Sequence, residues 1–454
     1  MKKSWPAWRY LWKSQDIRQK LLITLGILVI YRFAANVPVP GINYGVLQDL
    51  QSQLAQSGGT FFQFLDLLSG GTVSHFSLLA MGVYPYITAQ IILQLLVPII
   101  PSLQRMQQEN PNEARKWMEK WTLILTIPMA TLSALGQISI FNSLARQFGT
   151  VVPFGFTQDM IVPSLAILTA MVGGTMFAIW LGELISEFGI RNQGLSLIIF
   201  AGIVARIPNN FTGLLSDSTY WWLLVTFMVV VILATIFAIV YVQQGRRYVP
   251  VMYPGRRVGN RMSMPVKGSF PLLVNMAGMI PLIFAGALLQ FPSILASYFT
   301  SSENETVANM ATSIVSWFNG GSWSYWLVYF LMVVGFTFFY TAVLFEQQNY
   351  GDNLKKMGAQ IPGVNRGPAT QKYLSKVQNR ITFVGALFLG LVAILPFLIS
   401  QLLQVITGGT TNTAGLFLTS SAGLLIVVGV VRDTFSNIDA ELKLHGYTDS
   451  IIVK

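Results

Sequence analysis

Apolar segments of about membrane-spanning length recur along the whole chain and constrain its fold more than any other feature. The hydrocarbon core of a bilayer is about 30 Å thick, so a helix needs roughly 20 apolar residues to cross it. Only 10% of the 454 residues are charged, whereas soluble globular domains carry about 25% charged residues. The pattern predicts an all-α integral membrane protein with ten transmembrane helices. The predicted spans are residues 20–37, 76–100, 121–142, 160–182, 194–207, 220–242, 271–295, 323–345, 381–407 and 414–431.

Lysine and arginine set the predicted orientation of these spans, because both residues concentrate in the cytosolic loops of membrane proteins. If the N-terminus lies inside, all 29 Lys and Arg residues fall in inside segments except Arg32, Arg146 and Arg206. The segments 37–75 and 296–322, which would then lie mostly outside, contain no Lys or Arg. The distribution predicts an N-in, C-in topology.

The two ends of the chain are predicted to stay in the cytosol. Residues 1–19 are amphipathic and basic, and no small-residue cleavage site follows the first apolar run. We therefore expect a cytosolic segment at the membrane interface, and not a cleaved signal peptide. Residues 435–454 form the predicted cytosolic C-terminal tail.

One sequence pattern occurs in both the second and the seventh span. Segments Gly82–Gln94 and Gly278–Gln290 agree at six of 13 positions, at a constant offset of 196. This offset divides the chain into two five-helix halves, 20–207 and 208–434, and an odd number of helices per half makes the halves inverted across the membrane. Inverted repeats place a functional pathway at their interface, so a central pore is predicted between the halves.

Pro85 and Pro281 occupy matching positions in this repeat. Proline inside a helix removes a backbone hydrogen bond and bends the helix. We expect both residues to kink their helices, as would suit a gate. The alternative is a pair of kinks with a purely structural role, since proline is frequent in membrane spans.

The chain offers little for catalysis. It contains no Cys, and its two histidines, His75 and His445, fall on opposite sides of the predicted membrane. No HExxH or GxxxxGK[ST] motif is present. We expect no enzyme activity, no metal site and no cofactor. The alternative to a channel is a ten-helix ion-coupled solute transporter, which would need ionisable residues inside its spans; no carboxylate lies at a predicted midspan.

Aliphatic side chains are the candidates for the lining of a pore. Val83 and Ile87 share one helix face, as do Leu195 and Ile199, because residues four apart are neighbours on a helix. The repeat adds the counterparts of Ile87 and Ile199. A ring of such side chains closes a pore to water and ions by dewetting, although each member alone is equally consistent with ordinary packing. The candidate ring is Val83, Ile87, Leu195, Ile199, Ile283 and Ile426.

Three segments between the spans are unusual. The segment 38–75 contains an apolar piece, 61–68, that is too short to span; it predicts either a short helix tucked back into the protein or a helix in an outer loop. The inside loop 243–270 holds six basic and no acidic residues, and the loop 346–380 holds six basic and two acidic residues. Such loops can bind ribosomal RNA backbone, an acidic protein surface or anionic lipid.

Seven segments together carry a resemblance to a known family. They are YRFAANVPVPG (31–41), LLSGGTVSHFSLLAMGVYPYITAQIILQLL (67–96), GGTMFAIWLGELISEFGI (173–190), LSLIIFAGIVA (195–205), LLVNMAGMIPLIFA (272–285), GDNLKKMGAQIPG (351–363) and GLLIVVGVVRDT (423–434). Over nearly its whole length the chain resembles the SecY family, the channel subunits of bacterial protein-export translocons.

The resemblance implies a function and a set of functional residues. Unfolded secretory polypeptides would cross the bacterial plasma membrane through the aliphatic ring, and residues about 60–72 would form a plug. The second and third spans would face the seventh and eighth across a lateral gate, where Pro85 and Pro281 lie and where signal peptides and membrane helices leave for lipid. The implied plug residues are Phe61, Phe62, Phe64, Leu65, Leu67 and Leu68.

The resemblance also implies partners for the basic loops. The SecA motor ATPase or a translating ribosome, through its RNA, would dock there, and the small membrane subunits SecE and SecG would complete the complex. Where the family usually has Ile-Pro-Gly-Ile-Arg-Pro-Gly, this chain reads Ile361-Pro-Gly-Val-Asn-Arg-Gly-Pro368, so the loop arginine is displaced by one position. The implied docking residues are Arg256, Arg257, Arg261, Lys355, Lys356 and Arg366.

Overall fold

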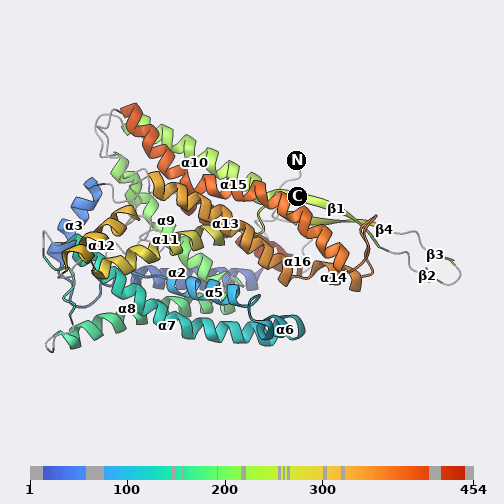
Figure 1. Cartoon of the computed structure of the whole chain (residues 1–454), viewed down its shortest axis with the longest axis horizontal. Coiled ribbons are helices and arrows are strands. Elements are labelled where there is room, and N and C mark those ends of the chain that lie inside the picture. Colours follow the sequence, from blue (N-terminus) through green and yellow to red (C-terminus); the bar gives the residue numbers. More distant parts are fainter. Residues whose placement is uncertain are drawn as a thin grey trace.

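The computed structural model shows a bundle of long helices with a narrow β-ribbon extending from one end (Figure 1). The described residues are 14–57, 76–145, 149–155, 158, 160–191, 193–215, 221–253, 257–258, 261–262, 266–299, 304–318, 323–407 and 421–444. Four predicted features lie wholly or partly outside these residues: the N-terminal segment up to residue 13, the plug residues, Arg256, and the C-terminal tail from residue 445.

Each of the ten predicted spans contains a helix. In the first half these are α2 (Gln15–Ala34), α5 (Tyr84–Leu96), α7 (Pro111–Leu144), α8 (Ile161–Phe188) and α9 (Gly194–Leu215). In the second half they are α10 (Trp221–Gln244), α11 (Ile280–Phe299), α13 (Trp323–Gln347), α15 (Pro368–Thr407) and α16 (Ser421–Leu444). Among the described residues, four shorter helices lie between them: α3 (Tyr44–Ser57), α6 (Pro101–Glu109), α12 (Glu305–Trp317) and α14 (Tyr350–Lys356).

Five described helical stretches are long and apolar enough to cross a membrane on their own: Asn112–Asn142, Ile161–Phe188, Val225–Gln244, Trp323–Lys356 and Pro368–Ile399. A sixth results if Tyr84–Leu96 and Pro101–Gln107, which meet at a 98° bend, are counted as one span. The outward faces of these helices are apolar, since Leu233 and Phe237 of α10 are 62% and 73% exposed. These features confirm the prediction of a helical, multi-pass membrane protein.

The repeated pattern marks two helix beginnings, and the prediction that its prolines kink helices is wrong. α5 begins at Tyr84 and α11 at Ile280, so Pro85 and Pro281 are each the second residue of a helix. There a missing backbone N–H costs nothing, because the first N–H groups of a helix have no partner within it. Gly82 and Gly278 have φ of 52° and 65°, a conformation that glycine adopts without strain.

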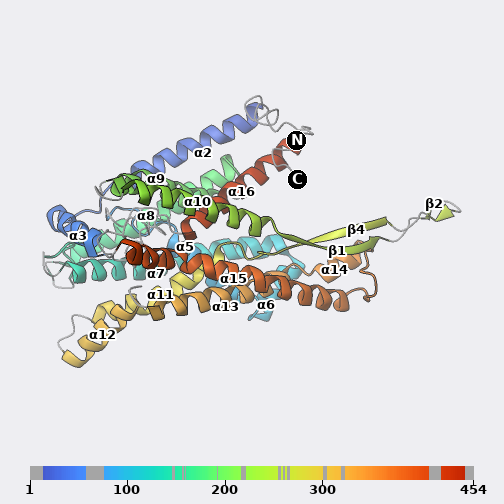
Figure 2. The ribbon, with the colours of Figure 1, turned by 90° about the horizontal axis from the view of Figure 1, so that it is seen from above.

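The two repeat-bearing helices run in opposite directions through the bundle. α5 leads toward α6, at the end of the bundle that carries the ribbon, whereas α11 leads toward α12 at the other end (Figures 1 and 2). Opposite directions are what an inverted repeat requires.

The ribbon occupies most of the predicted inside loop 243–270, where the sequence analysis placed only a basic loop. Strand β1 (Arg246–Tyr253) pairs with β4 (Val266–Leu273) in antiparallel register, with Arg246 opposite Leu273. Two short strands, β2 (Arg257–Val258) and β3 (Arg261–Met262), pair nearer its tip. α6 and α14 lie at the same end of the bundle (Figure 1).

The beginning of α2 and the end of α16 also lie together. The Lys20 ammonium forms an ion pair with Glu441, and Asp16 lies 3.1 Å from the same nitrogen. The two ends of the described chain are therefore on one side of the bundle, as the predicted topology requires.

Candidate functional site

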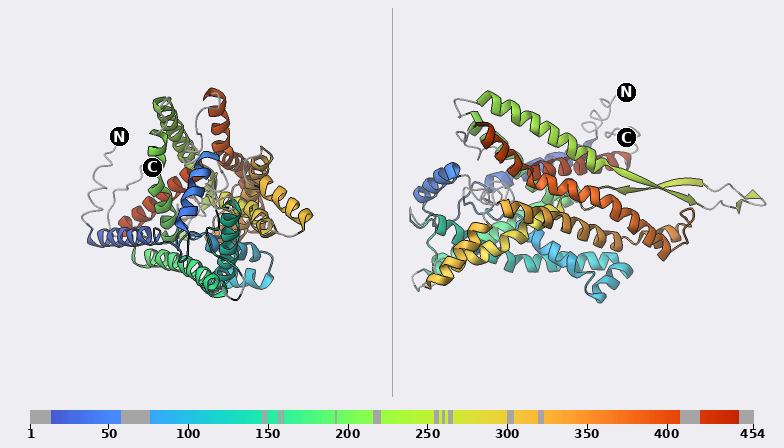
Figure 3. Two further views of the ribbon diagram at one scale, coloured as in Figure 1. Left: turned by 90° about the vertical axis from the view of Figure 1, so that its left-hand side faces the viewer. Right: turned by 45° about the horizontal axis from the view of Figure 1, so that its top comes forward.

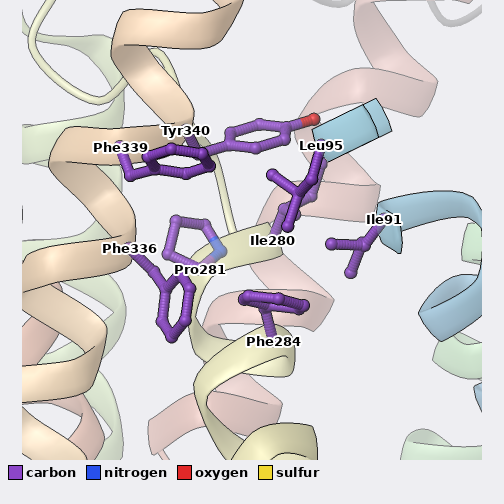
Figure 4. Close-up of a pocket in the computed structure, with 8 residues that line it drawn as sticks. All are labelled: Ile91, Leu95, Ile280, Pro281, Phe284, Phe336, Phe339 and Tyr340. Atoms are coloured by element: carbon purple, nitrogen blue, oxygen red, sulfur yellow. The ribbon is translucent and has the colours of Figure 1, made fainter. Parts of the chain in front are cut away.

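An apolar pocket lies where α5, α11 and α13 meet. The pocket is small, and Figure 4 shows the side chains that surround it. The rings of Phe284 and Phe336 meet edge to face, with centroids 4.3 Å apart. The lining residues are Ile91 and Leu95 from α5, Ile280, Pro281 and Phe284 from α11, and Phe336, Phe339 and Tyr340 from α13.

The pocket lies on a boundary between the two halves of the chain. α5 belongs to the first half, and α11 and α13 belong to the second. α7 from the first half also packs against α11. The predicted lateral gate was formed by these same four helices, so the structure brings together the elements that the gate requires.

One described hydrogen bond joins α13 to α5 beside this pocket. The Tyr340 hydroxyl, which points from α13 toward α5 in Figure 4, donates to Oε1 of Gln94 over 3.2 Å. Tyr340 is 7% exposed, so water competes little for this bond. Thr341, the next residue, has a buried hydroxyl without a hydrogen-bond partner among the described residues.

Five of the six candidate ring residues share one hydrophobic cluster. Val83, Ile199 and Ile426 are buried within it, and Ile87 and Leu195 are half-buried and pack against it. The sixth, Ile283, is 5% exposed but is not a member of this cluster among the described residues. The cluster joins α9 and the start of α5 to α16, as the ring hypothesis requires. Ile283 lies outside the cluster, on α11.

The ribbon and the loop after α14 form one packed unit on the basic end of the bundle. Met252 and Gln360 exchange two backbone hydrogen bonds of 2.8 Å, so this loop adds a bridge to the free edge of β1. The ribbon and this loop share a hydrophobic cluster. It includes Val249, Val251, Leu272, Phe345, Leu354, Ile361 and Leu374. The predicted inside loops are therefore held in a fixed relation to each other.

The described docking candidates lie on or beside this unit. Lys355, Lys356 and Arg366 are exposed. Arg257 and Arg261 lie on β2 and β3, nearer the tip of the ribbon. Tyr350, at the start of α14, packs against Phe345, and the centroids of the two rings are 5.0 Å apart.

The sequence analysis missed the aromatic side of the pocket. Phe284, Phe336 and Tyr340 occur in long apolar runs, where no pattern distinguishes them from lipid-facing residues. Gln94 offered a weak signal, because it is a polar residue in an apolar helix and recurs in the repeat as Gln290.

The fold and this site define a class of protein: a helical membrane protein whose two groups of helices meet at an apolar pocket. The chain belongs to the SecY family, since a family profile described as SecY matches residues 77–435. It is 36% identical to the protein translocase subunit SecY of Thermotoga maritima over 98% of this chain and 97% of that protein. It is 39% identical to that of Aquifex aeolicus over 95% of this chain and 96% of that protein.

Solved structures share the fold at lower sequence identity. A structure described as a protein conducting channel aligns with a TM-score of 0.61 and 19% identity, over 96% of this chain and 95% of that one. A structure described as Sec61 in the canine ribosome–channel complex gives the same score and identity, with the same coverage.

Proposed function

We propose that this chain is the polypeptide-conducting subunit of a protein translocase in a bacterial plasma membrane. Membership of the SecY family over nearly the whole chain carries the proposal, because the relatives from Thermotoga maritima and Aquifex aeolicus are named protein translocase subunit SecY. The chain performs no catalysis itself, and partners supply the energy. The family assignment disfavours the alternative, an ion-coupled solute transporter.

The aliphatic cluster is the proposed seal of the pore. A channel for unrelated polypeptides cannot depend on sequence-specific polar contacts, whereas aliphatic side chains part around any chain and close again by dewetting. Val83, Ile87, Leu195, Ile199 and Ile426 already lie together. In this proposal Ile283 completes the ring from α11, and the plug near residues 60–72 seals the outer side.

The pocket between α5, α11 and α13 is the proposed lateral gate. Its apolar lining suits the hydrophobic helix of a signal peptide or a membrane protein, and its position between the halves gives such a helix a route into lipid. Pro85 and Pro281, as residues that begin helices, place α5 and α11 on either side of this route.

The ribbon unit is the proposed docking platform for cytosolic partners. Its exposed lysines and arginines suit an acidic protein surface or an RNA backbone. The SecA motor and a translating ribosome are the proposed partners here; support for the ribosome comes from the similar Sec61 structure, which is described in a ribosome–channel complex. The small subunits SecE and SecG complete the proposed complex.

Cross-linking across the pocket tests the function. Because the chain contains no Cys, Ile91→Cys and Ile280→Cys can be combined and joined by a short reducible cross-linker in membrane vesicles. We expect cross-linking to abolish import of an unfolded secretory protein and reduction to restore it. Phe237→Cys with Tyr241→Cys is the matched control, because both residues lie on the exposed face of α10 with ring centroids 6.4 Å apart. Undiminished import by the cross-linked Ile91/Ile280 variant would refute the gate.

The proposed seal has its own test. Ile87→Asn combined with Ile283→Asn introduces amides where dewetting is needed. We expect ion conductance of resting channels in planar bilayers to rise severalfold. Leu233→Asn on the exposed face of α10 is the control, and unchanged conductance in the double variant would remove these residues from the seal.

A further inference from the structure

Helix α12 lies at the end of the bundle opposite the ribbon and connects α11 to α13 (Figure 1). Viewed along the bundle in the left part of Figure 3, it points outward from the other helices. Its beginning is well defined, because the Thr306 N–H donates to Oδ1 of Asn304 over 3.3 Å. α12 is therefore a formed helix that leaves the bundle sideways.

The surface of α12 has three faces. The face toward the protein is centred on Ala311, which is 3% exposed. The polar face carries hydroxyl groups that donate hydrogen bonds to the helix backbone. The Ser313 hydroxyl, for example, donates to the carbonyl oxygen of Asn309 over 2.8 Å. The third face is apolar and exposed, and its residues recur at helical spacing. They are Val307 (36% exposed), Met310 (68%), Ile314 (40%) and Trp317 (43%).

Exposed apolar residues also lie on the ends of the two spans that α12 connects. Leu295 and Phe299, near the end of α11, are 40% and 55% exposed. Trp323 and Leu327, at the start of α13, are 65% and 47% exposed. α13 is itself long and apolar enough to cross a membrane, so the stripe borders a surface that faces lipid.

We propose that α12 lies in the interfacial layer of the bilayer, with its apolar stripe in the acyl chains and its polar face in water. Amphipathic helices bind in this layer through apolar burial and through attraction of basic residues to anionic lipid. α12 contains no Lys or Arg, so apolar burial carries the binding. Trp317 fits the layer as well, because indole rings favour the membrane–water interface.

The anchor has a consequence for the proposed gate. α12 joins α11 and α13, and both helices line the apolar pocket. A helix fixed at the membrane surface holds the ends of both spans at one depth while the pocket changes width. The interfacial placement itself rests on the bundle spanning a membrane, and not on polypeptide transport, so either proposal can fail without the other.

Pairs of adjacent residues provide the test. Single nitroxide labels are placed at Met310→Cys and Ile314→Cys, with Asn309→Cys and Ser313→Cys as matched neighbours on the polar face. The full chain, with the subunits that copurify with it, is reconstituted in vesicles of phosphatidylethanolamine and phosphatidylglycerol. Collision with oxygen, which concentrates in lipid, is compared with collision with a water-soluble nickel chelate.

We expect the labels at 310 and 314 to collide mainly with oxygen, and those at 309 and 313 mainly with the chelate. Replacing phosphatidylglycerol by a neutral lipid should leave the pattern unchanged. Equal chelate access at 310 and 309 would place the stripe in water and overturn the proposal. Protection of the label at position 310 from both reagents would also overturn the proposal, because protein would then cover the stripe.

Discussion

The two halves of this molecule meet along two seams that differ in packing. At the gate seam, α5 faces α11 and α13 around the small apolar pocket, α7 packs against α11, and the Tyr340–Gln94 hydrogen bond joins α13 to α5. At the rear seam, α16 packs against α9 and shares one hydrophobic cluster with α2, α8 and α9. There Ile438 and Val430 of α16 are buried in one cluster with Ile17 and Ile198.

Polar contacts reinforce the rear seam. Lys20 of α2 pairs with Glu441 of α16, and the Asn437 side chain donates to the Arg191 carbonyl over 3.3 Å. Side chains around a void lack part of the dispersion attraction that close packing supplies. If the pocket is the proposed gate, the contrast predicts that the halves separate there and turn about the rear, and each seam can be tested alone.

The largest expected effect comes from truncating one apolar side chain in each seam. Ile198 is fully buried in the rear cluster, so Ile198→Ala should lower the free energy of unfolding by about 2–5 kcal/mol. Leu95 is only half-buried, on the lining of the pocket, so Leu95→Ala should cost less, about 1 kcal/mol. Thermal unfolding in detergent measures the loss of stability in both variants. Equal losses would contradict the proposed difference in packing between the seams.

The helices of both seams, and part of the apolar cluster at the rear seam, could be predicted from the sequence. Runs of apolar residues located the ten long helices but not α3, α6, α12 or α14, and helical spacing together with the repeat selected six residues, five of which the fold brings into one cluster. These signals are local or periodic. Even so, the repeat was misread in detail, since the left-handed conformations of Gly82 and Gly278 turn a supposed kink into a helix beginning.

The polar side of the seams could not be predicted. Tyr340 and Gln94 are 246 positions apart, and Lys20 and Glu441 are 421 apart; only the fold brings such partners together. The ribbon was missed for a related reason. Its strands contain Pro250 and Pro271, which weaken any local strand signal, and its stability depends on the cluster beneath it.

An intermediate effect is expected from the hydrogen bond across the gate. Tyr340→Phe removes a bond worth about 0.5–1.5 kcal/mol, so the gate should open more readily and import of a protein with a weakened signal peptide should increase. Tyr329→Phe is the control. Its hydroxyl bonds to the Leu282 carbonyl at 3.4 Å, which joins α13 to α11 within one half. If both variants import alike, the Tyr340 bond does not restrain the gate.

The smallest expected effect comes from the ion pair at the rear seam. Both side chains are 22% exposed, so solvent and salt screen the pair, and such pairs contribute about 0–1 kcal/mol. Glu441→Gln should lower the unfolding temperature slightly at low salt, and high salt should reduce the difference because it screens the wild-type pair. Glu119→Gln removes the more exposed pair with Arg115 and should change less. If Glu441→Gln also increased import, the ion pair would restrain opening, and the rear seam would have to be treated as a second moving boundary.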